Sequence, residues 1–179
     1  MVTWWDFPAL AREERLDVLP DRVFESYRLT VKSSWGNSYI IRAERRHNED
    51  RDNPDYGGIT FPEFSYRVVA HRLHFEKLAA SAETKIHEIQ WACLEALLRE
   101  ARFWELPESG GHGGFDGANW LVEGNREGRY HRVRRWSPDP EIDQEWLVLP
   151  CQYLRDLASL ALLLSGRTEA GGAADRPRD

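Results

Sequence analysis

The sequence has little of what would tie it to a membrane, a disulfide framework or an oxidising compartment. Only two of its 179 residues are cysteines, Cys93 and Cys151, and their spacing fits no metal site. Because both lie in helix-like segments, we expect them to be buried free thiols in a reducing compartment. The longest apolar run, LASLALLLSG, is too short for a bilayer, which requires about 20 residues. The opening MVTWWDFPALAREER lacks the basic start and apolar core of a signal peptide, so a cytoplasmic location is expected.

Signatures of catalysis and of cofactor binding are also scarce. The glycine-rich GGHGG at 110–114 lacks the lysine and the following helix of a phosphate-binding loop. His71 and His74 are an odd number of positions apart on an expected strand, so their rings should point to opposite faces and not share a metal. The acidic loop after His47 lacks the ordered ligand pattern of a calcium loop. We therefore expect neither a metal nor a cofactor.

Aromatic residues and local blocks of charge are abundant instead. The chain has eight tryptophans and a formal net charge of -6. Residues 47–63 hold five acids and one arginine, whereas residues 119–136 hold five arginines and two glutamates. Non-specific phosphate binding needs a broad positive field, which an acidic chain with one basic ribbon does not have. Direct binding to nucleic acid is therefore not expected.

Alternation of apolar and polar side chains predicts several strands. The predicted strands are residues 22–31, 38–45, 63–75, 118–124 and 129–136. On the first of them Val23, Tyr27, Leu29 and Val31 share one face, and Glu25 is the charged exception on that face. Residues 47–62 are polar and contain Asn-Pro and Gly-Gly pairs, which predicts a long exposed loop.

Three segments have a helical pattern. They are residues 7–19, 84–104 and 151–165. The expected core stripe of the second consists of Ile86, Ile89, Cys93, Leu97 and Trp104, widened by Trp91 and Leu94. Ser81 or Thr84 is expected to cap its start, and Pro107 to end it. The last helix is expected to begin after Pro150 and to stop at Gly166.

These elements predict one α+β domain over residues 1–166. An antiparallel sheet of about five strands should carry helices packed on one face. Residues 167–179 lack large apolar side chains, so a disordered C-terminal tail is expected.

The segment DGANWLVEGNREGRYHRVRRWSP, residues 116–138, concentrates aromatic and arginine side chains around two glycine-containing turns. It reads as a hairpin whose NREG turn uses Gly128 for a positive φ. One face of the second strand carries Tyr130, Arg132, Arg134 and Trp136, and the other carries Arg129, His131, Val133 and Arg135. Guanidinium groups between aromatic rings can stack on them and hold an anion, although a solvated strand has the same pattern. Glu123 is the expected cross-strand partner of Arg132 or Arg134.

Three pieces, FWELP, DGANWLVEG and GRYHRVRRWSP, resemble an uncharacterised bacterial protein family with the pattern FWxLP, DGxxWxxEG and YHxxxRWSP. The resemblance covers under a third of the chain and brings no known activity, so it implies a shared fold alone. Arg134 stands where that pattern often has an acidic residue, which makes the strand more basic. In the last two pieces, the residues that match the family pattern are Asp116, Gly117, Trp120, Glu123, Gly124, Tyr130, His131, Arg135, Trp136, Ser137 and Pro138.

The preferred hypothesis is a non-enzymatic protein-binding or inhibitory protein that occludes its partner, such as a toxin-neutralising, immunity-like protein. Tryptophan, tyrosine and arginine are favoured as interface anchors. An acidic loop can block a basic enzyme, so the expected partner is a toxin or another enzyme that acts on nucleic acids or nucleotides. The expected partner-binding residues are Trp35, Asp50, Asp52, Asp55, Tyr56, Arg132, Arg134 and Trp136.

Two other hypotheses remain open. An enzyme or a binder of small anionic ligands would use Asp116, Glu123, His131 and Arg135, with His131 as a base and Arg135 holding the anion. Because Tyr130 and His131 are adjacent on a strand, they cannot both face one substrate. A subunit of a larger assembly would instead expose an apolar patch, for example on the leucine-rich C-terminal helix.

Overall fold

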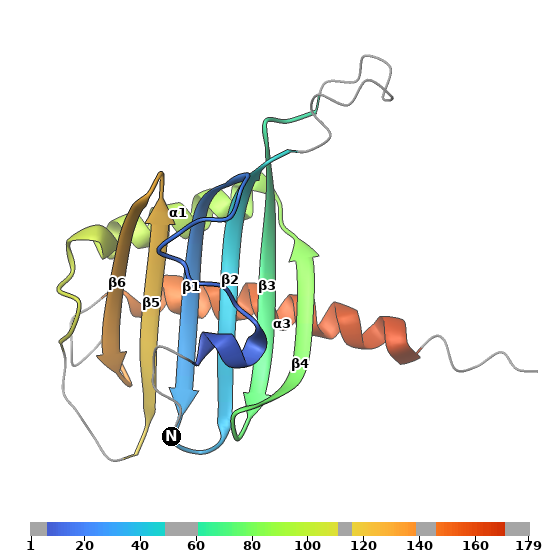
Figure 1. Ribbon diagram of the computed structural model, residues 1–179, viewed down its shortest axis with the longest axis vertical. Coiled ribbons are helices and arrows are strands. Elements are labelled where there is room, and N and C mark those ends of the chain that lie inside the picture. The colour runs from blue at the N-terminus through green and yellow to red at the C-terminus, as the bar shows by residue number, and fades with distance from the viewer. Residues whose placement is uncertain (1–6, 49–60, 111–115, 139–145, 171–179) are drawn as a thin grey trace, which may run out of the picture.

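The computed structural model describes residues 7–48, 61–110, 116–138 and 146–170, and their side chains as far as Leu163. In this part of the chain, antiparallel strands form one six-stranded sheet in the order β4-β3-β2-β1-β5-β6. Helices α1 and α3 lie on one face of the sheet and the short η1 lies on the other (Figure 1). The strands are β1 (Val23–Ser33), β2 (Asn37–His47), β3 (Phe64–His74), β4 (Lys77–Lys85), β5 (Ala118–Arg126) and β6 (Arg129–Trp136), and the helices are η1 (Pro8–Ala11), α1 (Glu88–Glu100), η3 (Phe103–Glu105) and α3 (Val148–Ala170). The predicted α+β class is confirmed, with six strands rather than about five.

Strand β4 is the element that the sequence did not predict. Its segment KLAASAETK is poor in β-branched and aromatic residues. The turn before it is formed by Phe75 and Glu76, both of which have positive φ, so the usual glycine or asparagine turn signal is missing. Thr84 pairs with Val68 within the sheet. The prediction of a helix from residue 84 was therefore wrong.

Helix α1 is shorter than predicted, and its buried face is rotated about the helix axis relative to the predicted apolar stripe. His87 caps it, since its side chain accepts a hydrogen bond from Ile89 N while the backbone N–H of His87 donates to Gln90 Oε1. Neither Ser81 nor Thr84 is the cap, and the helix ends at Glu100, before η3 and Pro107. The buried stripe is Trp91, Leu94 and Leu98, whereas Ile89 and Cys93 of the predicted stripe are exposed.

The predicted and the observed stripes on α1 both satisfy helical spacing. The size of the side chains therefore decided which stripe faces the sheet. The indole of Trp91 packs against the rings of Tyr27 and Tyr66, with centroids 5.9 and 5.8 Å apart. Burying the largest side chain removes the most apolar surface from water. The prediction that Cys93 is buried was wrong for this reason, and Cys151 is buried as predicted.

Helix α3 starts earlier and ends later than predicted. Pro150 lies within its first turn, where the missing N–H costs no intrahelical hydrogen bond. The helix continues past Gly166 to Ala170, and residues 171–179 of the predicted tail lie outside the described residues. Its buried face, which runs from Val148 to Ala161, packs under β2, β3 and β4.

The face of the sheet toward α1 and α3 forms the main apolar core. Tyr27, Leu29 and Val31 alternate into it as predicted. The ladder between β1 and β2 is irregular between Val23 and Glu25. Val23 therefore lies on the opposite face, where it lines a groove, and its predicted orientation was wrong.

The opposite face of the sheet is crossed by the N-terminal strap, residues 7–20. Only Pro8–Ala11 of the predicted N-terminal helix forms, as η1, and Arg12 ends it with a φ of 59°. Phe7 and Ala11 pack on Ile40 and Leu73. Figure 1 shows this segment passing in front of the central strands, away from α1 and α3. The strap makes the fold three-layered over the centre of the sheet.

Candidate functional site

The surface between the strap and the sheet is unusually polar for a buried one. It contains charged and hydroxyl side chains from four neighbouring strands, and most of them are almost fully covered. The buried ones are Ser26, Arg28, Thr30, Glu44, His71, Glu123 and Asn125. Charges can be buried only when they are paired. We call this set, together with Glu13 of the strap, the polar layer.

Glu13 is the centre of the polar layer. One carboxylate oxygen, Oε1, lies 3.0 Å from His71 Nε2, and the other accepts a hydrogen bond of 2.6 Å from Arg42 Nε. Arg28 Nη1 lies 3.8 Å from the same Oε2. Burial alone would raise the pKa of Glu13, but the hydrogen bond from His71 and the charges of Arg42 and Arg28 bring the net pKa below its ordinary value. Glu13 is therefore held as a carboxylate.

Arg28 links the strap to β5 and β6. Its Nε and Nη2 atoms lie 2.8 and 2.7 Å from Glu123 Oε2, and its Nη1 donates to the backbone oxygen of Glu14 at 2.6 Å. Tyr130 donates its hydroxyl proton to the other oxygen of Glu123 at 2.8 Å. Burial and the charge of Glu123 raise the pKa of Tyr130. The phenol therefore stays protonated as a donor.

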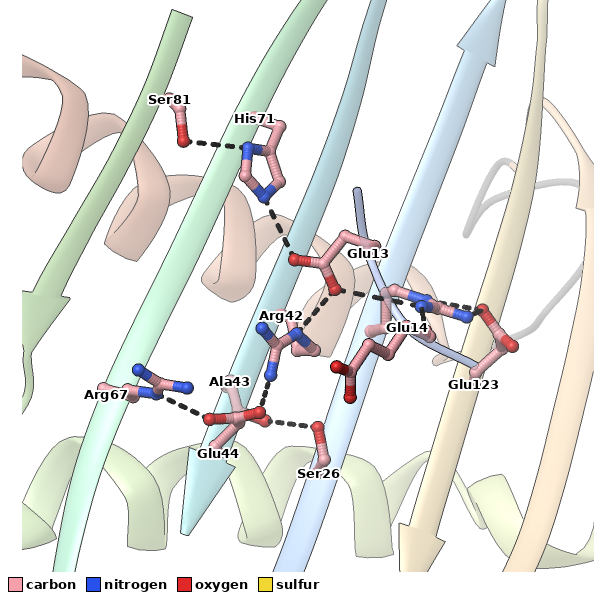
Figure 2. Close-up of polar contacts among 11 residues, drawn as sticks. Glu13, Glu14, Ser26, Arg42, Ala43, Glu44, Arg67, His71, Ser81 and Glu123 are labelled. Atoms are coloured by element: carbon pink, nitrogen blue, oxygen red, sulfur yellow. Dashed lines mark hydrogen bonds and ion pairs between the residues drawn. The ribbon is translucent and has the colours of Figure 1, made fainter. Parts of the chain in front are cut away.

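A second carboxylate, Glu44, organises the other side of the layer. It pairs with Arg42 on its own strand and accepts a 2.6 Å hydrogen bond from Arg67 of β3. Arg67 also reaches Glu83 of β4 at 2.7 Å. Acids and guanidinium groups thus alternate across the sheet, and Figure 2 shows the chain of contacts from Glu123 to Arg67. Each charge is neutralised by its neighbours.

His71 extends the polar layer to the edge of the sheet. Its Nδ1 lies 2.9 Å from the hydroxyl oxygen of Ser81 on β4, while its Nε2 faces Glu13 (Figure 2). Ser81 is exposed, but His71 and Glu13 are buried. His74, as predicted, does not join His71, and its Nδ1 contacts the side chain of Asn37 instead. No sequence pattern predicted this relay, because residue 13 lies far from the histidine along the chain.

A groove runs beside the strap above β5 and β6, with a volume of about 430 Å³. Its floor contains Arg28, Glu123 and Tyr130, and its rim contains Arg15 and Arg132. These groups could contact a polar molecule, but the floor residues already satisfy one another. The groove has both signs of charge and is open to solvent.

The residues predicted to bind a partner fall into three groups by their location in the chain. Arg132, Arg134 and Trp136 lie on the face of β6 that also carries the strap, and Arg134 is exposed. Arg132 lies opposite Glu123 in the sheet, as expected, and donates to Glu108 at 3.3 Å, while Arg28 binds Glu123. Trp35 is exposed in the turn between β1 and β2. Asp50, Asp52, Asp55 and Tyr56 lie outside the described residues.

Aromatic side chains gather at one end of the sheet. The turns between β1 and β2 and between β3 and β4 lie there, beside the start of β5 and the end of β6 (Figure 1). Trp35 and Phe75 are 72% and 68% exposed at these turns. Phe75 N donates to Gly36 O at 2.9 Å, and Ser34 N donates to Gly117 O at 3.0 Å. Trp136 packs over Gly117 at the same end. We call Trp35, Phe75 and Trp136 the aromatic end.

The structure does not bring the alternative ligand residues together. Glu123 is opposite Arg132 and faces the strap, whereas His131 is opposite Gly124 and faces the helices with Arg135. Asp116 is exposed just before β5, at the aromatic end. A site that needs Glu123 and His131 side by side is therefore contradicted by the geometry.

His131 and Arg135 hold the FWELP segment instead. The imidazole of His131 packs edge-on against Phe103, with ring centroids 5.2 Å apart. The Nη1 of Arg135 donates to the backbone oxygen of Pro107 at 3.2 Å. A Cβ atom on Gly124 would lie 2.7 Å from the Phe103 ring. These three residues of the family pattern are thus explained by the packing of η3 on β5 and β6.

Glu25, the charged exception on the apolar face, is fully buried and contacts one phenol and two guanidinium groups. Tyr27 Oη, Arg126 Nε and Arg45 Nη2 lie 2.5, 2.9 and 3.1 Å from its oxygens. Burial raises the pKa of Glu25 despite these partners. Burial would lower the pKa of Arg126, but the charge of Glu25 and its other anionic neighbours brings the net pKa above the ordinary value.

Neither metal nor membrane features appear in the ranges that the structure describes. No group of three or more His, Cys, Asp and Glu side chains in these ranges could hold a metal ion. No helix there has the length and the apolar character needed to cross a membrane.

No protein-family model, curated protein or solved structure matches this chain. The resemblance to the uncharacterised bacterial family therefore stays a prediction.

Proposed function

We propose that the protein binds another protein and inhibits it by occlusion, in the manner of a toxin-neutralising, immunity-like protein. The observation that carries this proposal is the aromatic end. Trp35 and Phe75 project from two neighbouring turns with most of their surface exposed. Large exposed aromatic side chains are frequent anchors of protein interfaces. The docking surface we propose is the aromatic end together with Arg132 and Arg134 of β6.

The polar layer supports this proposal by making the surface rigid. Strap, β1, β2, β3 and β5 are joined by ion pairs around Glu13 and Arg28. The backbone turns at the aromatic end are also linked to each other by hydrogen bonds. A surface that is already ordered loses less entropy on binding. Such a scaffold suits an inhibitor that must bind tightly without rearranging.

Charge suggests the kind of partner. The chain has a net charge of -6, and Asp50, Asp52 and Asp55 belong to its most acidic segment. An acidic protein attracts the basic surfaces of enzymes that act on nucleic acids or nucleotides. We propose such an enzyme as the partner, with Arg132 and Arg134 pairing with carboxylates at the edge of its binding face.

The proposal is tested by capture from a lysate of the native host at low salt. The bait is the full chain as wild type, Trp35→Ala or Trp146→Ala. Trp146 is a matched control, because it is 65% exposed but lies next to α3 on the helix side. A hot-spot tryptophan contributes about 2 kcal/mol or more, so Trp35→Ala should weaken binding by at least about 30-fold.

The expected result is a stoichiometric partner that the wild type and Trp146→Ala retain and Trp35→Ala loses. Arg132→Glu should weaken the same complex. The wild-type protein should also inhibit the purified partner at a one-to-one ratio. Absence of a stoichiometric partner, or equal capture by the two tryptophan variants, would contradict the proposal.

A further inference from the structure

The relay of Ser81, His71 and Glu13 has the order of a nucleophile, a base and a carboxylate. Ser81 Oγ lies 2.9 Å from His71 Nδ1, and His71 Nε2 lies 3.0 Å from Glu13 Oε1 (Figure 2). The three residues come from β4, β3 and the strap. Both distances are within hydrogen-bond range, so a proton can pass from the serine to the imidazole while the carboxylate orients the ring.

The surroundings of Glu13 fix the direction of these hydrogen bonds. Its carboxylate is held in the ionised form by Arg42 and Arg28. An ionised carboxylate can only accept, so His71 must carry a proton on Nε2. In the neutral imidazole the other nitrogen, Nδ1, is then a free acceptor, and Ser81 donates to it. This is the arrangement that prepares a serine hydroxyl for attack.

We infer that Ser81 is a nucleophile for acyl transfer, with His71 as its general base and Glu13 as a positioning residue. Ser81 is exposed on β4, which is an edge strand of the described sheet. Alternate backbone N–H groups of an edge strand point outward without a partner strand. We assign to such groups beside Ser81 the role of donors to a developing oxyanion. The proposed substrates are esters of small carboxylic acids, because Ser81 is open to solvent.

The reaction has two balanced steps. Ser81 Oγ attacks the ester carbonyl carbon while its proton moves to His71 Nδ1, and the imidazolium is stabilised by the Glu13 carboxylate. The tetrahedral intermediate then collapses, the C–O bond to the alcohol breaks, and the alcohol leaves with the proton from Nδ1. In the second step water attacks the acyl carbon while one of its protons moves to His71 Nδ1. The C–O bond to Ser81 then breaks, Ser81 Oγ takes the proton from Nδ1, and the carboxylic acid leaves.

The charged groups near His71 fit these roles. Glu13 faces its Nε2 from the strap, and Arg42 from β2 binds the same carboxylate. Because Glu13 remains paired with arginines, it does not itself take up the proton but stabilises the charge that forms on His71. The aromatic end is formed by other residues, so this activity is separate from the docking surface.

The probe for this site is p-nitrophenyl acetate, with the full-length protein as wild type, Ser81→Ala and Ser159→Ala. Ser159 is an exposed serine on α3 whose hydroxyl donates to Arg155 O, so it is a matched control. Release of p-nitrophenolate should fall to the buffer rate in Ser81→Ala and stay unchanged in Ser159→Ala. Peptide mapping should locate one acetyl group on Ser81.

The roles of the other two residues are tested in the same assay. Loss of a general base costs about 10²–10⁴-fold, so His71→Ala should be slow, and added imidazole should restore part of its rate. His74→Ala is the matched control and should keep the wild-type rate. Glu13→Gln should lower kcat and leave KM unchanged, at a temperature at which a thermal melt shows that this variant is fully folded.

Equal rates for the wild type and Ser81→Ala, or acetylation elsewhere than Ser81, would overturn the inference. Because Ser81 is exposed, the alanine variant should fold, and a thermal melt checks this. Partner capture by Ser81→Ala should match the wild type. Failure of the esterase assay and failure of the binding proposal are therefore observed separately.

Discussion

Replacement of Glu13 by glutamine tests whether the polar layer stabilises the fold or is tolerated at a cost. Glutamine keeps the size of the side chain but removes its charge. One end of the amide then presents N–H groups to a donor, either His71 or Arg42, because both donate to Glu13. The variant therefore loses one charge-assisted hydrogen bond and gains a conflict between donors.

The loss of unfolding free energy depends on which other carboxylates Arg28 and Arg42 still pair with. Removing one partner of a buried ion pair costs about 3–5 kcal/mol when the other charge is left alone. Here Arg28 keeps Glu123 and Arg42 keeps Glu44, so we expect about 2 kcal/mol. For a chain of this length that corresponds to a decrease in Tm of about 4–8 °C. Urea unfolding at neutral pH measures the free energy directly.

The dependence on pH separates Glu13 from Glu25. The folded-state pKa of Glu13 lies below its ordinary value of 4.5. Its stabilising contribution is therefore complete above that value and is lost as the pH falls through the folded pKa. Burial raises the pKa of Glu25 above 4.5, so its contribution is complete below 4.5 and is lost as the pH rises through the folded pKa.

The two glutamine variants should thus have opposite slopes. Relative to the wild type, Glu13→Gln should be least stable near neutral pH and should approach the wild type in acid. Glu25→Gln should instead improve relative to the wild type as the pH rises from about 4 to 7. Urea titrations at several pH values give both slopes. Slopes of the same sign would refute the assignment of opposite pKa directions to these two carboxyl groups.

Two further predictions concern packing and exposure. Gly124→Ala should destabilise the fold by about 1–3 kcal/mol, because its Cβ would lie 2.7 Å from the Phe103 ring and 2.9 Å from the Tyr27 ring; a thermal melt with an unchanged Tm would contradict this packing. Cys93 is exposed and Cys151 is buried with a raised pKa, so a thiol reagent should label one cysteine in the native protein and two in urea. Rapid labelling of both in the native state would show that the face of α3 that carries Cys151 is not packed against the sheet.

The hairpin at 116–138 was predictable because its information is local. Side chains alternate with a period of two, and Gly128 with a φ of 82° closes the turn. The faces assigned to Tyr130, Arg132, Arg134 and Trp136 follow from that alternation and are confirmed. Strand β4 lacked both signals, since its alanines and polar residues favour no strand and its turn contains no glycine.

The polar layer was not predictable, because no local sequence pattern indicates its contacts. A helix was expected over residues 7–19, and an exposed helical Glu13 would have had no reason to contact His71 or Arg42. Only the end of η1 at Arg12 sends the chain across the sheet and brings Glu13 onto three strands. The alternating charges on β1 and β2 were visible, but they look the same on a solvated face.

The position of the charges also explains why the strap crosses where it does. The apolar residues Phe7 and Leu16 anchor its two ends, while Asn125 donates to the backbone oxygens of Leu16 and Asp17. Between those anchors, a neutral side chain would remove the carboxylate that Arg28, Arg42 and His71 share. A carboxylate of the length of glutamate reaches both arginines and His71. The strap is therefore specified by a charge requirement of the sheet rather than by its own helical propensity, and this requirement is what orients His71 toward Ser81.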